Sequence, residues 1–238
     1  MTTLTKIIVS TLLSLSLFSC HFDFGETGNG NVTIEDRNVT ESFTSIKATE
    51  GLNVYLTQSD TESITVEADE NLQELIITEV ENGVLKIHTK KNIGRSKSKK
   101  VMVSFKTISG ITSTSGSNVY STNTIKVDDL ELKSTSGSNM TLEINTTALN
   151  SKSTSGSNLR LSGSTSQIIA EATSGSNIKA GDLNSESSEV KATSGANITV
   201  NTSKKLVAKA SSGGHVKYYG DPETVDKSDD VSGNISKR

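Results

Sequence analysis

Residues 151–180 read SKSTSGSNLRLSGSTSQIIAEATSGSNIKA and contain the pentapeptide Thr-Ser-Gly-Ser-Asn twice. The pentapeptide or a close variant of it occurs repeatedly in the second half of the chain, at 114–118, 135–139, 154–158, 173–177, 193–197 and 211–215. The central glycines of consecutive copies are 21, 19, 19, 20 and 18 residues apart. A repeat of about twenty residues is typical of a solenoid, in which every unit packs against its neighbours.

The order of apolar and polar residues inside each repeat indicates its secondary structure. Three positions after the central glycine every copy has an apolar residue. The fourth position is mostly polar, and the fifth is mostly apolar again. This period of two predicts strands, and the repeats show no period of 3.6 that would indicate a helix. Three positions before the glycine every copy has Ser or Ala, which predicts a narrow place in the interior.

These strands predict the fold. Twenty residues at about 3.3 Å each make a path of about 66 Å, which suits a flattened coil whose turns stack about 4.8 Å apart. We therefore expect an all-β fold, a single-stranded parallel β-helix that forms a right-handed solenoid with about 20 residues per turn. The repeats should fill 106–238. Residues 31–105 carry the pattern less regularly, since Thr49 to Tyr55 align with 114–120, and should form irregular first turns or a sheet-like cap.

Stacked turns place equivalent side chains in columns along the solenoid axis. The serines just before the glycines and the asparagines two positions after them should form hydrogen-bonded ladders. If alternation continues through the glycine, Ser points inward and Thr joins Asn on an outer face. If the glycine has a positive φ and turns a corner, Asn can cap the corner from inside. The candidate ladder or binding surface consists of Thr114, Asn118, Thr135, Asn139, Thr154, Asn158, Thr173, Asn177, Thr193 and Asn197.

The start of the chain has the pattern of a bacterial lipoprotein signal peptide. A mostly apolar run ends at Phe18 and is too short to span a bilayer as a helix. Leu17-Phe18-Ser19-Cys20 resembles the lipobox, which implies cleavage before Cys20 and lipidation of this single cysteine. We expect 1–19 to be removed, 20–30 to form a lipidated, flexible tether, and the lipid to hold the protein at the outer membrane, on the cell surface or the periplasmic face. The alternative is an ordinary signal peptide that ends at a free cysteine.

Composition and charge exclude several classes of function. A net charge of -3 does not suit bulk electrostatic binding of nucleic acid, so we expect no nucleic-acid partner. One cysteine cannot make a disulfide framework, and three histidines far apart in sequence do not supply a zinc site. The sequence has no nucleophile-elbow, zinc-protease, P-loop or dinucleotide-binding motif. We therefore predict a non-enzymatic protein without cofactors or metals.

Two charged segments have competing interpretations. Lys97, Lys99 and Lys100 belong to a basic segment that can contact lipid phosphates or anionic glycans, although such a run is more often a solvated loop. The pairs Asp128-Asp129 and Asp229-Asp230 lack the spaced oxygen ligands of a calcium-binding loop, so we predict no specific metal there.

The ordered set of motifs resembles the head GIN domain family of bacterial proteins, which is described as a putative auto-transporter adhesin. The resemblance covers about residues 28–238 and includes Gly51-Leu52-Asn53-Val54, the Ser-Gly-Ser-Asn repeats and Tyr218-Tyr219-Gly220-Asp221-Pro222. It implies a β-helical fold and an exported, often lipid-anchored protein.

Several functions are compatible with these features. The one that we expect is a non-catalytic adhesin or binding module of the cell envelope, whose Thr, Asn and Ser side chains contact carbohydrate or an envelope protein. The second is a structural module that forms homo-oligomers through open β-edges. The third is a polysaccharide-active enzyme, which is disfavoured because charges such as Arg160, Lys179, Glu143 and Glu171 do not recur in one column with acids beside bases. A regular outward Thr face would instead suit an ice or crystal surface.

Overall fold

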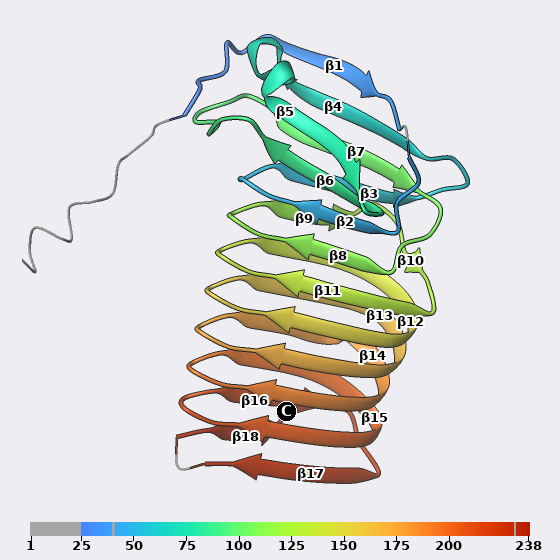
Figure 1. Ribbon diagram of the computed structural model, residues 1–238. Helices are drawn as coiled ribbons and strands as arrows, with labels where there is room; N and C mark the ends of the chain where they lie inside the picture. Colours follow the sequence, from blue (N-terminus) through green and yellow to red (C-terminus); the bar gives the residue numbers. More distant parts are fainter. Residues whose placement is uncertain (1–24, 40, 231) are drawn as a thin grey trace, which may run out of the picture.

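Consecutive copies of the repeat lie directly on one another in the computed structural model (Figure 1), which describes residues 25–39, 41–230 and 232–238. Asn139 pairs with Asn158, Asn158 with Asn177 and Asn177 with Asn197 in parallel register. The chain forms a β-solenoid of about 7 turns with roughly 19 residues per turn, which confirms the predicted fold class. Residues 1–24, including Cys20 and the predicted signal peptide, lie outside the described residues.

One short 3-10 helix and a series of strands make up the described chain. In order, they are β1 (Val32–Arg37), β2 (Ser45–Ala48), β3 (Asn53–Gln58), β4 (Ser63–Asp69), η2 (Glu70–Leu75), β5 (Ile76–Glu81), β6 (Val84–Thr89), β7 (Lys99–Phe105), β8 (Gly110–Ser113), β9 (Asn118–Ser121), β10 (Ile125–Lys126), β11 (Asp129–Ser134), β12 (Asn139–Ser153), β13 (Asn158–Ala172), β14 (Asn177–Ala192), β15 (Asn197–Ala210), β16 (His215–Tyr219), β17 (Thr224–Asp229) and β18 (Asn234–Lys237).

The solenoid has two flat faces and two different edges (Figure 1). Each long strand from β12 to β15 crosses one face, bends, and returns across the other. The front face of Figure 1 consists of β8, β11, β17 and the second halves of β12 to β15, and the back face holds β9, β16, β18 and the first halves. We call the edge with the tight Ser-Gly turns the turn edge, and the edge where β12 to β15 bend the bend edge.

The turn edge is built from two consecutive residues with left-handed backbone. In the third repeat Ser155 has a φ of 53° and Gly156 a φ of 70°, and the other repeats have the same pair. A non-glycine residue in this region costs about 1–2 kcal/mol, so Ser is strained at every turn. The Gly156 amide donates to the Ser174 carbonyl of the next turn at 3.1 Å, which ties the corners together. The corner arrangement of the turn is confirmed, and unbroken alternation through the glycine is wrong.

The inside of the corner is filled by serine, and the expectation that Asn caps it from inside is wrong. The buried Ser157 hydroxyl lies 2.8 Å from the Ser153 hydroxyl and donates to the Ser134 carbonyl at 2.7 Å. Only small side chains fit here, which explains why the position three before the glycine is always Ser or Ala. The predicted ladder of serines just before the glycines is also wrong, because the positive φ directs Ser155 and its equivalents to solvent.

The asparagines form a continuous ladder on the outside of the corner. The Nδ2 of each residue donates to the Oδ1 of the residue one turn nearer the cap, at 2.9–3.0 Å throughout. We call this column the asparagine ladder, and it consists of Asn53, Asn118, Asn139, Asn158, Asn177 and Asn197. Its first member comes from the irregular region, and the pairing of Asn53 with Asn118 confirms the alignment of Thr49 to Tyr55 with 114–120.

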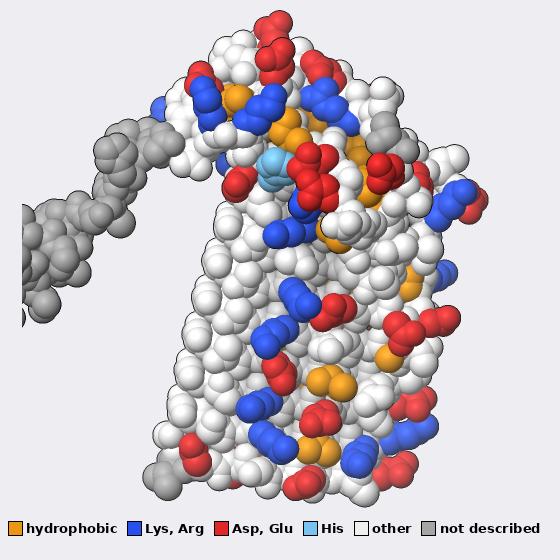
Figure 2. All heavy atoms as spheres, in the orientation of Figure 1, with side chains coloured by type: hydrophobic (Ala, Val, Ile, Leu, Met, Phe, Trp, Pro, Cys, Tyr) orange, Lys and Arg blue, Asp and Glu red, His pale blue; other side chains and the backbone are white. Residues whose placement is uncertain are grey.

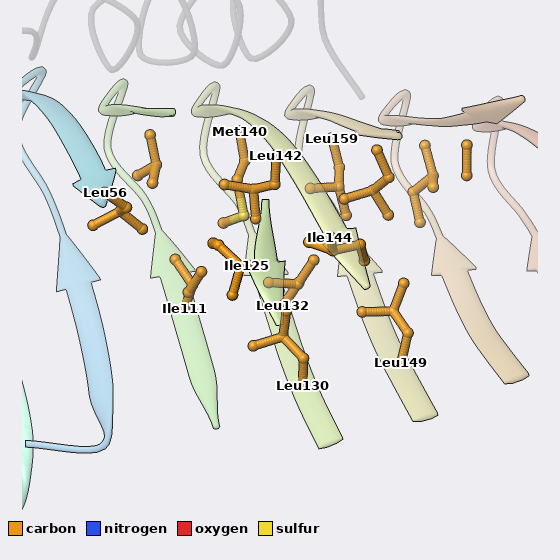
Figure 3. Packing of buried hydrophobic residues seen from close by; sticks show 14 of the residues in the cluster. Leu56, Ile111, Ile125, Leu130, Leu132, Met140, Leu142, Ile144, Leu149 and Leu159 are labelled. Carbon is orange, nitrogen blue, oxygen red and sulfur yellow. The ribbon is translucent and has the colours of Figure 1, made fainter. Parts of the chain in front are cut away.

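The core is a thin stack of aliphatic side chains between the two faces (Figure 3). Leu132 comes from the front face, whereas Met140 and Leu142 come from the back face, and all are at most 1% exposed. Burying one such side chain stabilises the fold by about 1.5–3 kcal/mol. Because each turn contributes a few of them, stability comes from stacking many turns and not from one large core.

The amino-terminal end of the solenoid is covered by a sheet-like cap. β2 lies between β6 and β8, and β3 lies between β7 and β9, so residues 45–58 form a coil turn beneath the cap. Above it β4 pairs antiparallel with β1 and β7, and β5 pairs antiparallel with β6. The sheet-like cap is therefore confirmed, and the change to antiparallel pairing stops the stack of parallel turns at this end.

The chain is fixed to the cap before the predicted domain start. The Glu26 amide donates to the Asn92 carbonyl at 2.7 Å, and the Gly28 amide donates to the Arg95 carbonyl at 2.8 Å. The Gly30 amide donates to the Asp69 carboxylate at 2.8 Å. The sequence predicts a flexible tether over 20–30, but Glu26, Gly28 and Gly30 are bonded to the cap and are not part of a flexible tether.

The carboxyl-terminal end exposes two strand edges. β17 pairs with β15 and β18 pairs with β16, and no further described strand continues the stack. All six residues of β17 are exposed, and three of them are the charged residues Asp226, Lys227 and Asp229. Charged side chains on an edge strand oppose edge-to-edge pairing, so this end is protected against the self-assembly that open β-edges permit.

The asparagine ladder should contribute measurably to stability. Asn158→Ala removes two hydrogen bonds, one to Asn139 and one from Asn177, and we expect it to lower the free energy of unfolding by about 1–2 kcal/mol. Urea unfolding followed by circular dichroism measures this change. Asn150→Ala is the matched control, because Asn150 is exposed on the front face and its side chain has no bond to another described residue. Equal effects of the two substitutions would contradict the structural role of the ladder.

Candidate functional site

The Asn column of the turn edge holds successive turns together, and the Thr column does so between Thr173 and Thr193. Each asparagine amide bonds to its neighbours, and the Thr193 hydroxyl donates to the Thr173 hydroxyl at 3.0 Å. The five threonines of the repeats are half-buried. Figure 2 shows the turn edge as a strip largely free of charged side chains. The geometry gives the Asn column a structural task, and the use of either column as a binding surface stays a prediction.

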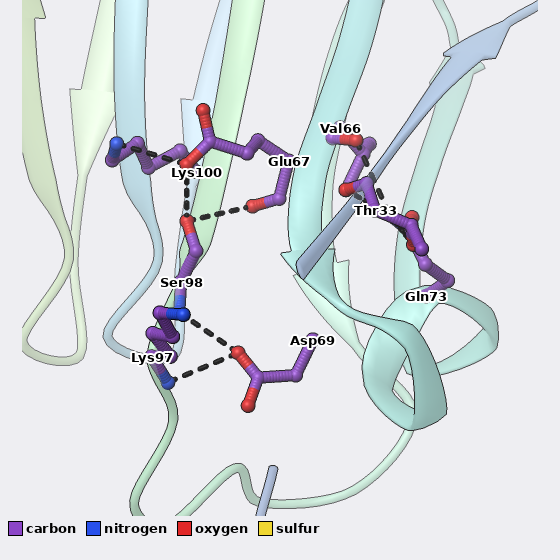
Figure 4. A network of polar contacts seen from close by, with 8 residues as sticks. All are labelled: Thr33, Val66, Glu67, Asp69, Gln73, Lys97, Ser98 and Lys100. Carbon is purple, nitrogen blue, oxygen red and sulfur yellow. Dashed lines mark hydrogen bonds and ion pairs between the residues drawn. The ribbon is translucent and has the colours of Figure 1, made fainter. Parts of the chain in front are cut away.

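The three candidate lysines lie in the cap, where part of the network is drawn in Figure 4. The Lys100 ammonium is 2.9 Å from the Glu67 carboxylate, which also accepts a bond from the Ser98 hydroxyl at 2.8 Å. The Lys100 and Ser98 bonds lower the pKa of Glu67, and the same carboxylate raises the pKa of Lys100. Burial lowers the pKa of Lys99. Lys97 has an exposed side chain, so of the three it is the most accessible to an anion.

The backbone around Lys97 is held by a buried carboxylate that sequence analysis missed. Asp69 is 0% exposed and accepts bonds from the amides of Lys97 at 3.0 Å and Ser98 at 2.9 Å (Figure 4). It also accepts a bond from the Gly30 amide at 2.8 Å. These amides, that of Ser98 above all, hold the pKa of Asp69 below its ordinary value. Nothing in the local sequence marks Asp69, because its partners are distant in the chain.

A shallow groove follows the bend edge along the solenoid axis. One hollow of about 460 Å3 is lined by Asn145, Thr146, Ser164 and Thr165 together with residues of the next turns. A second hollow of about 550 Å3 shares Asn145 and Thr146 with the first and continues towards the cap. We call the combined feature the bend-edge groove and define it by Asn145, Thr146, Ser164, Thr165, Asn184 and Asn201.

The side chains in this groove are polar, and some of them are free. Asn145 and Ser164 are exposed, and neither side chain bonds to any other residue that the structure describes. Behind them the buried Thr146 hydroxyl donates to the Thr165 hydroxyl at 2.9 Å, which satisfies the floor of the groove. Further along, Asn201 Nδ2 donates to Asn184 Oδ1 at 3.0 Å. The groove therefore offers unpaired amide and hydroxyl groups on a fixed polar floor.

A second feature adjoins the groove on the back face. A hollow of about 460 Å3 shares Asn201 with the bend-edge groove. We call it the tyrosine hollow, and its other lining residues are Arg160, Lys179, Gly181, Asp182, Thr199 and Tyr219. A smaller hollow of about 200 Å3 continues it through Lys179 and Thr199 to His215 and Lys217.

The two faces carry charge differently. On the front face, shown in Figure 2, positive and negative side chains alternate, and Lys133 pairs with Glu131 at 2.8 Å. On the back face Arg160 lies beside Lys179 in register, and within the described chain neither has a carboxylate within 4.0 Å. Asp182 lines the same hollow. Arg160 and Lys179 occupy one column, as their equal positions in the repeat predict, and no ion pair in the described chain joins Asp182 to either of them. The expectation that acids do not recur beside bases in one column stays a prediction.

Other kinds of site are not found in the part of the chain that the structure covers. No group of three or more His, Cys, Asp or Glu side chains among the described residues could hold a metal ion. The same residues include no helix that is long and apolar enough to cross a membrane.

A solenoid with uniform turns on one edge and a polar groove on the other is a repeat protein that presents an extended surface. The chain belongs to the family described as "Putative auto-transporter adhesin, head GIN domain", whose model matches residues 42–222. The predicted family is thereby confirmed, and the family indicates an extracellular or envelope protein.

Solved structures share the fold. A putative adhesin from Bacteroides fragilis superposes with a TM-score of 0.83 at 23% identity, over 90% of this chain and 100% of that chain. A putative adhesin from Parabacteroides merdae gives a TM-score of 0.72 at 18% identity, over 90% and 98% of the two chains. A putative lipid binding protein from Parabacteroides distasonis gives 0.71 at 22%, over 90% and 99%. A search of curated proteins finds no match.

The Asp69 carboxylate should make stability depend on pH. Its pKa is lowered in the folded state, so its contribution is complete above the ordinary carboxyl pKa of about 4 and is lost as pH falls through the folded value. Asp69→Asn cannot titrate and replaces an acceptor oxygen by a donor. We expect a lower urea midpoint at pH 7 and a smaller further loss between pH 5 and about pH 2 than in the wild type.

The control is Asp129→Asn at an exposed position of β11, which should keep the pH dependence of the wild type. Parallel pH profiles of Asp69→Asn and the wild type would show that Asp69 does not provide this linkage.

Proposed function

We propose that this protein is an exported, lipid-anchored adhesin of the bacterial cell envelope that binds an extended glycan in the bend-edge groove without catalysing a reaction. Membership of the adhesin family and the lipobox-like sequence at Cys20 support the location. The observation that carries the binding proposal is the row of exposed, unpaired amide and hydroxyl groups at Asn145 and Ser164, in a groove that runs along the axis.

The chemistry of these groups suits a glycan. Asn side chains donate and accept hydrogen bonds, and Ser hydroxyls do both, which matches the hydroxyl groups of sugars. Successive turns repeat such groups about every 4.8 Å, so a linear polymer along the axis meets equivalent groups turn after turn. A groove of this kind supplies many weak contacts from a rigid scaffold, which costs little conformational entropy on binding.

Glycan binding is tested by affinity electrophoresis of the full chain in gels that contain dextran, arabinoxylan or polygalacturonate. We expect retardation by at least one polymer. Asn145→Ala combined with Ser164→Ala should weaken it by about tenfold, since each lost hydrogen bond contributes about 0.5–1.5 kcal/mol.

Asn150→Ala on the front face is the control and should bind like the wild type. Retardation that survives the double substitution would place the site elsewhere, and no retardation by any polymer would refute glycan binding.

Lipid anchoring is tested separately with Cys20→Ala. We expect the wild type in the membrane fraction and the variant in the soluble fraction, because the variant has no thiol to acylate. Protease treatment of intact and lysed cells, followed with an antibody to the repeats, then distinguishes the cell surface from the periplasmic face. If Cys20→Ala stays in the membrane fraction, the lipid is not the anchor.

A further inference from the structure

The tyrosine hollow contains the aromatic ring of Tyr219. The small residue Gly181 and a register shift between β14 and β15 leave space for this ring. Tyr219 ends β16, and its ring lies against Gly181, two turns away along the stack. A Cβ on Gly181 would lie 3.2 Å from the ring and 3.3 Å from the Thr199 methyl, so a larger residue would crowd the ring. The register between β14 and β15 shifts between Ala180 and Asn184, which places Gly181 and Asp182 outside the regular ladder. Tyr219 remains 37% exposed.

Two cations line the same hollow as this ring. Arg160 and Lys179 are neighbours in register and, among the described residues, have no ion-pair partner. Lys217 lies two turns further in the same column, since Lys179 pairs with Thr199 and Thr199 with Lys217. Guanidinium and ammonium groups bind carboxylates by charge-assisted hydrogen bonds, which are about twice as strong as neutral ones. The hollow therefore has unused positive charge at the position where the polar groove reaches the back face.

The remaining groups of the hollow favour a sugar over a simple anion. Asp182 repels a free anion but accepts hydrogen bonds from hydroxyl groups, and Asn201 can both donate and accept. An exposed tyrosine ring provides a flat apolar surface with a polar tip, on which the apolar side of a ring-shaped ligand can pack. A ligand that satisfies all of these groups combines a carboxylate, several hydroxyls and a flat ring.

We propose that the tyrosine hollow is a specificity subsite for an acidic sugar, a uronic acid residue of the polymer that the bend-edge groove holds. This inference rests on the proposed glycan binding. The sugar carboxylate lies between Arg160 and Lys179, the ring stacks on Tyr219, and hydroxyls bond to Asp182 and Asn201. The bend-edge groove binds the rest of the chain, and the hollow selects acidic polymers.

The test compares polygalacturonate with neutral dextran and arabinoxylan, using the full chain and measuring the apparent Kd in each gel. We expect polygalacturonate to bind at least tenfold more tightly than either neutral polymer. Arg160→Gln combined with Lys179→Gln should remove this preference and leave binding to the neutral polymers within about twofold of the wild type. Tyr219→Leu should weaken polygalacturonate binding severalfold without changing its salt dependence, because the substitution removes no charge. Thermal unfolding verifies that each variant is folded.

The matched control is Lys133→Gln combined with Lys152→Gln, which removes the same charge from the front face. It should bind polygalacturonate like the wild type. An equal loss in the control would show non-specific attraction and overturn the proposal. Competition by inorganic phosphate as strong as that by galacturonic acid would show a simple anion site and also overturn it. Tight binding of the neutral polymers without a preference for polygalacturonate would refute the subsite and leave the proposed function intact, whereas no binding to any polymer would refute both.

Discussion

The structure depends on one constraint, that every turn of the coil must return to the same register at the turn edge, so that its backbone groups meet those of the turns on either side. The Ser-Gly pair meets this constraint on the turn edge, because two consecutive left-handed residues reverse the chain in the smallest space. The glycine amide of each corner donates to the serine carbonyl of the next corner. Small buried serines and the asparagine ladder then add side-chain bonds to the same seam, which fixes the register of both faces.

With register fixed at one edge, irregularity can accumulate at the other. The shift between β13 and β14 and the larger one between β14 and β15 both fall near the bend edge, where repeats of unequal length absorb their extra residues. Buried hydroxyls such as Thr146 and Thr165 satisfy one another there, while the exposed Asn145 amide has no side-chain hydrogen bond within the described chain. The irregular bend edge therefore contains the groove, and the regular turn edge contains the hydrogen bonds that stabilise the stack. This division resembles the common separation of a rigid scaffold from the irregular segments that bind ligands.

Much of the fold follows from the repeat. Its period, its alternation and its small columns define a β-solenoid with a corner at each Ser-Gly pair, and even the distant turn at Asn53 can be aligned by sequence. Two details could not be inferred. The chain pattern does not show that Ser157 and not Asn158 fills the corner, because two residues of positive φ disturb the alternation. It also does not show that Glu26 already bonds to the cap, because the partner, Asn92, is far away in sequence.

The sequence by itself determined the class of fold, the family and the expected export signal, because these depend on local patterns that repeat or stand at the start of the chain. Only the tertiary structure decided where the hollow that we propose as a ligand site lies. Arg160, Lys179, Gly181 and Tyr219 share no motif, and a strand irregularity and the stacking of turns bring them to one hollow. The hydrogen bonds that repeat in every turn can be predicted from the sequence of one repeat. A hollow that forms where the repeats differ depends on how several turns are placed against one another.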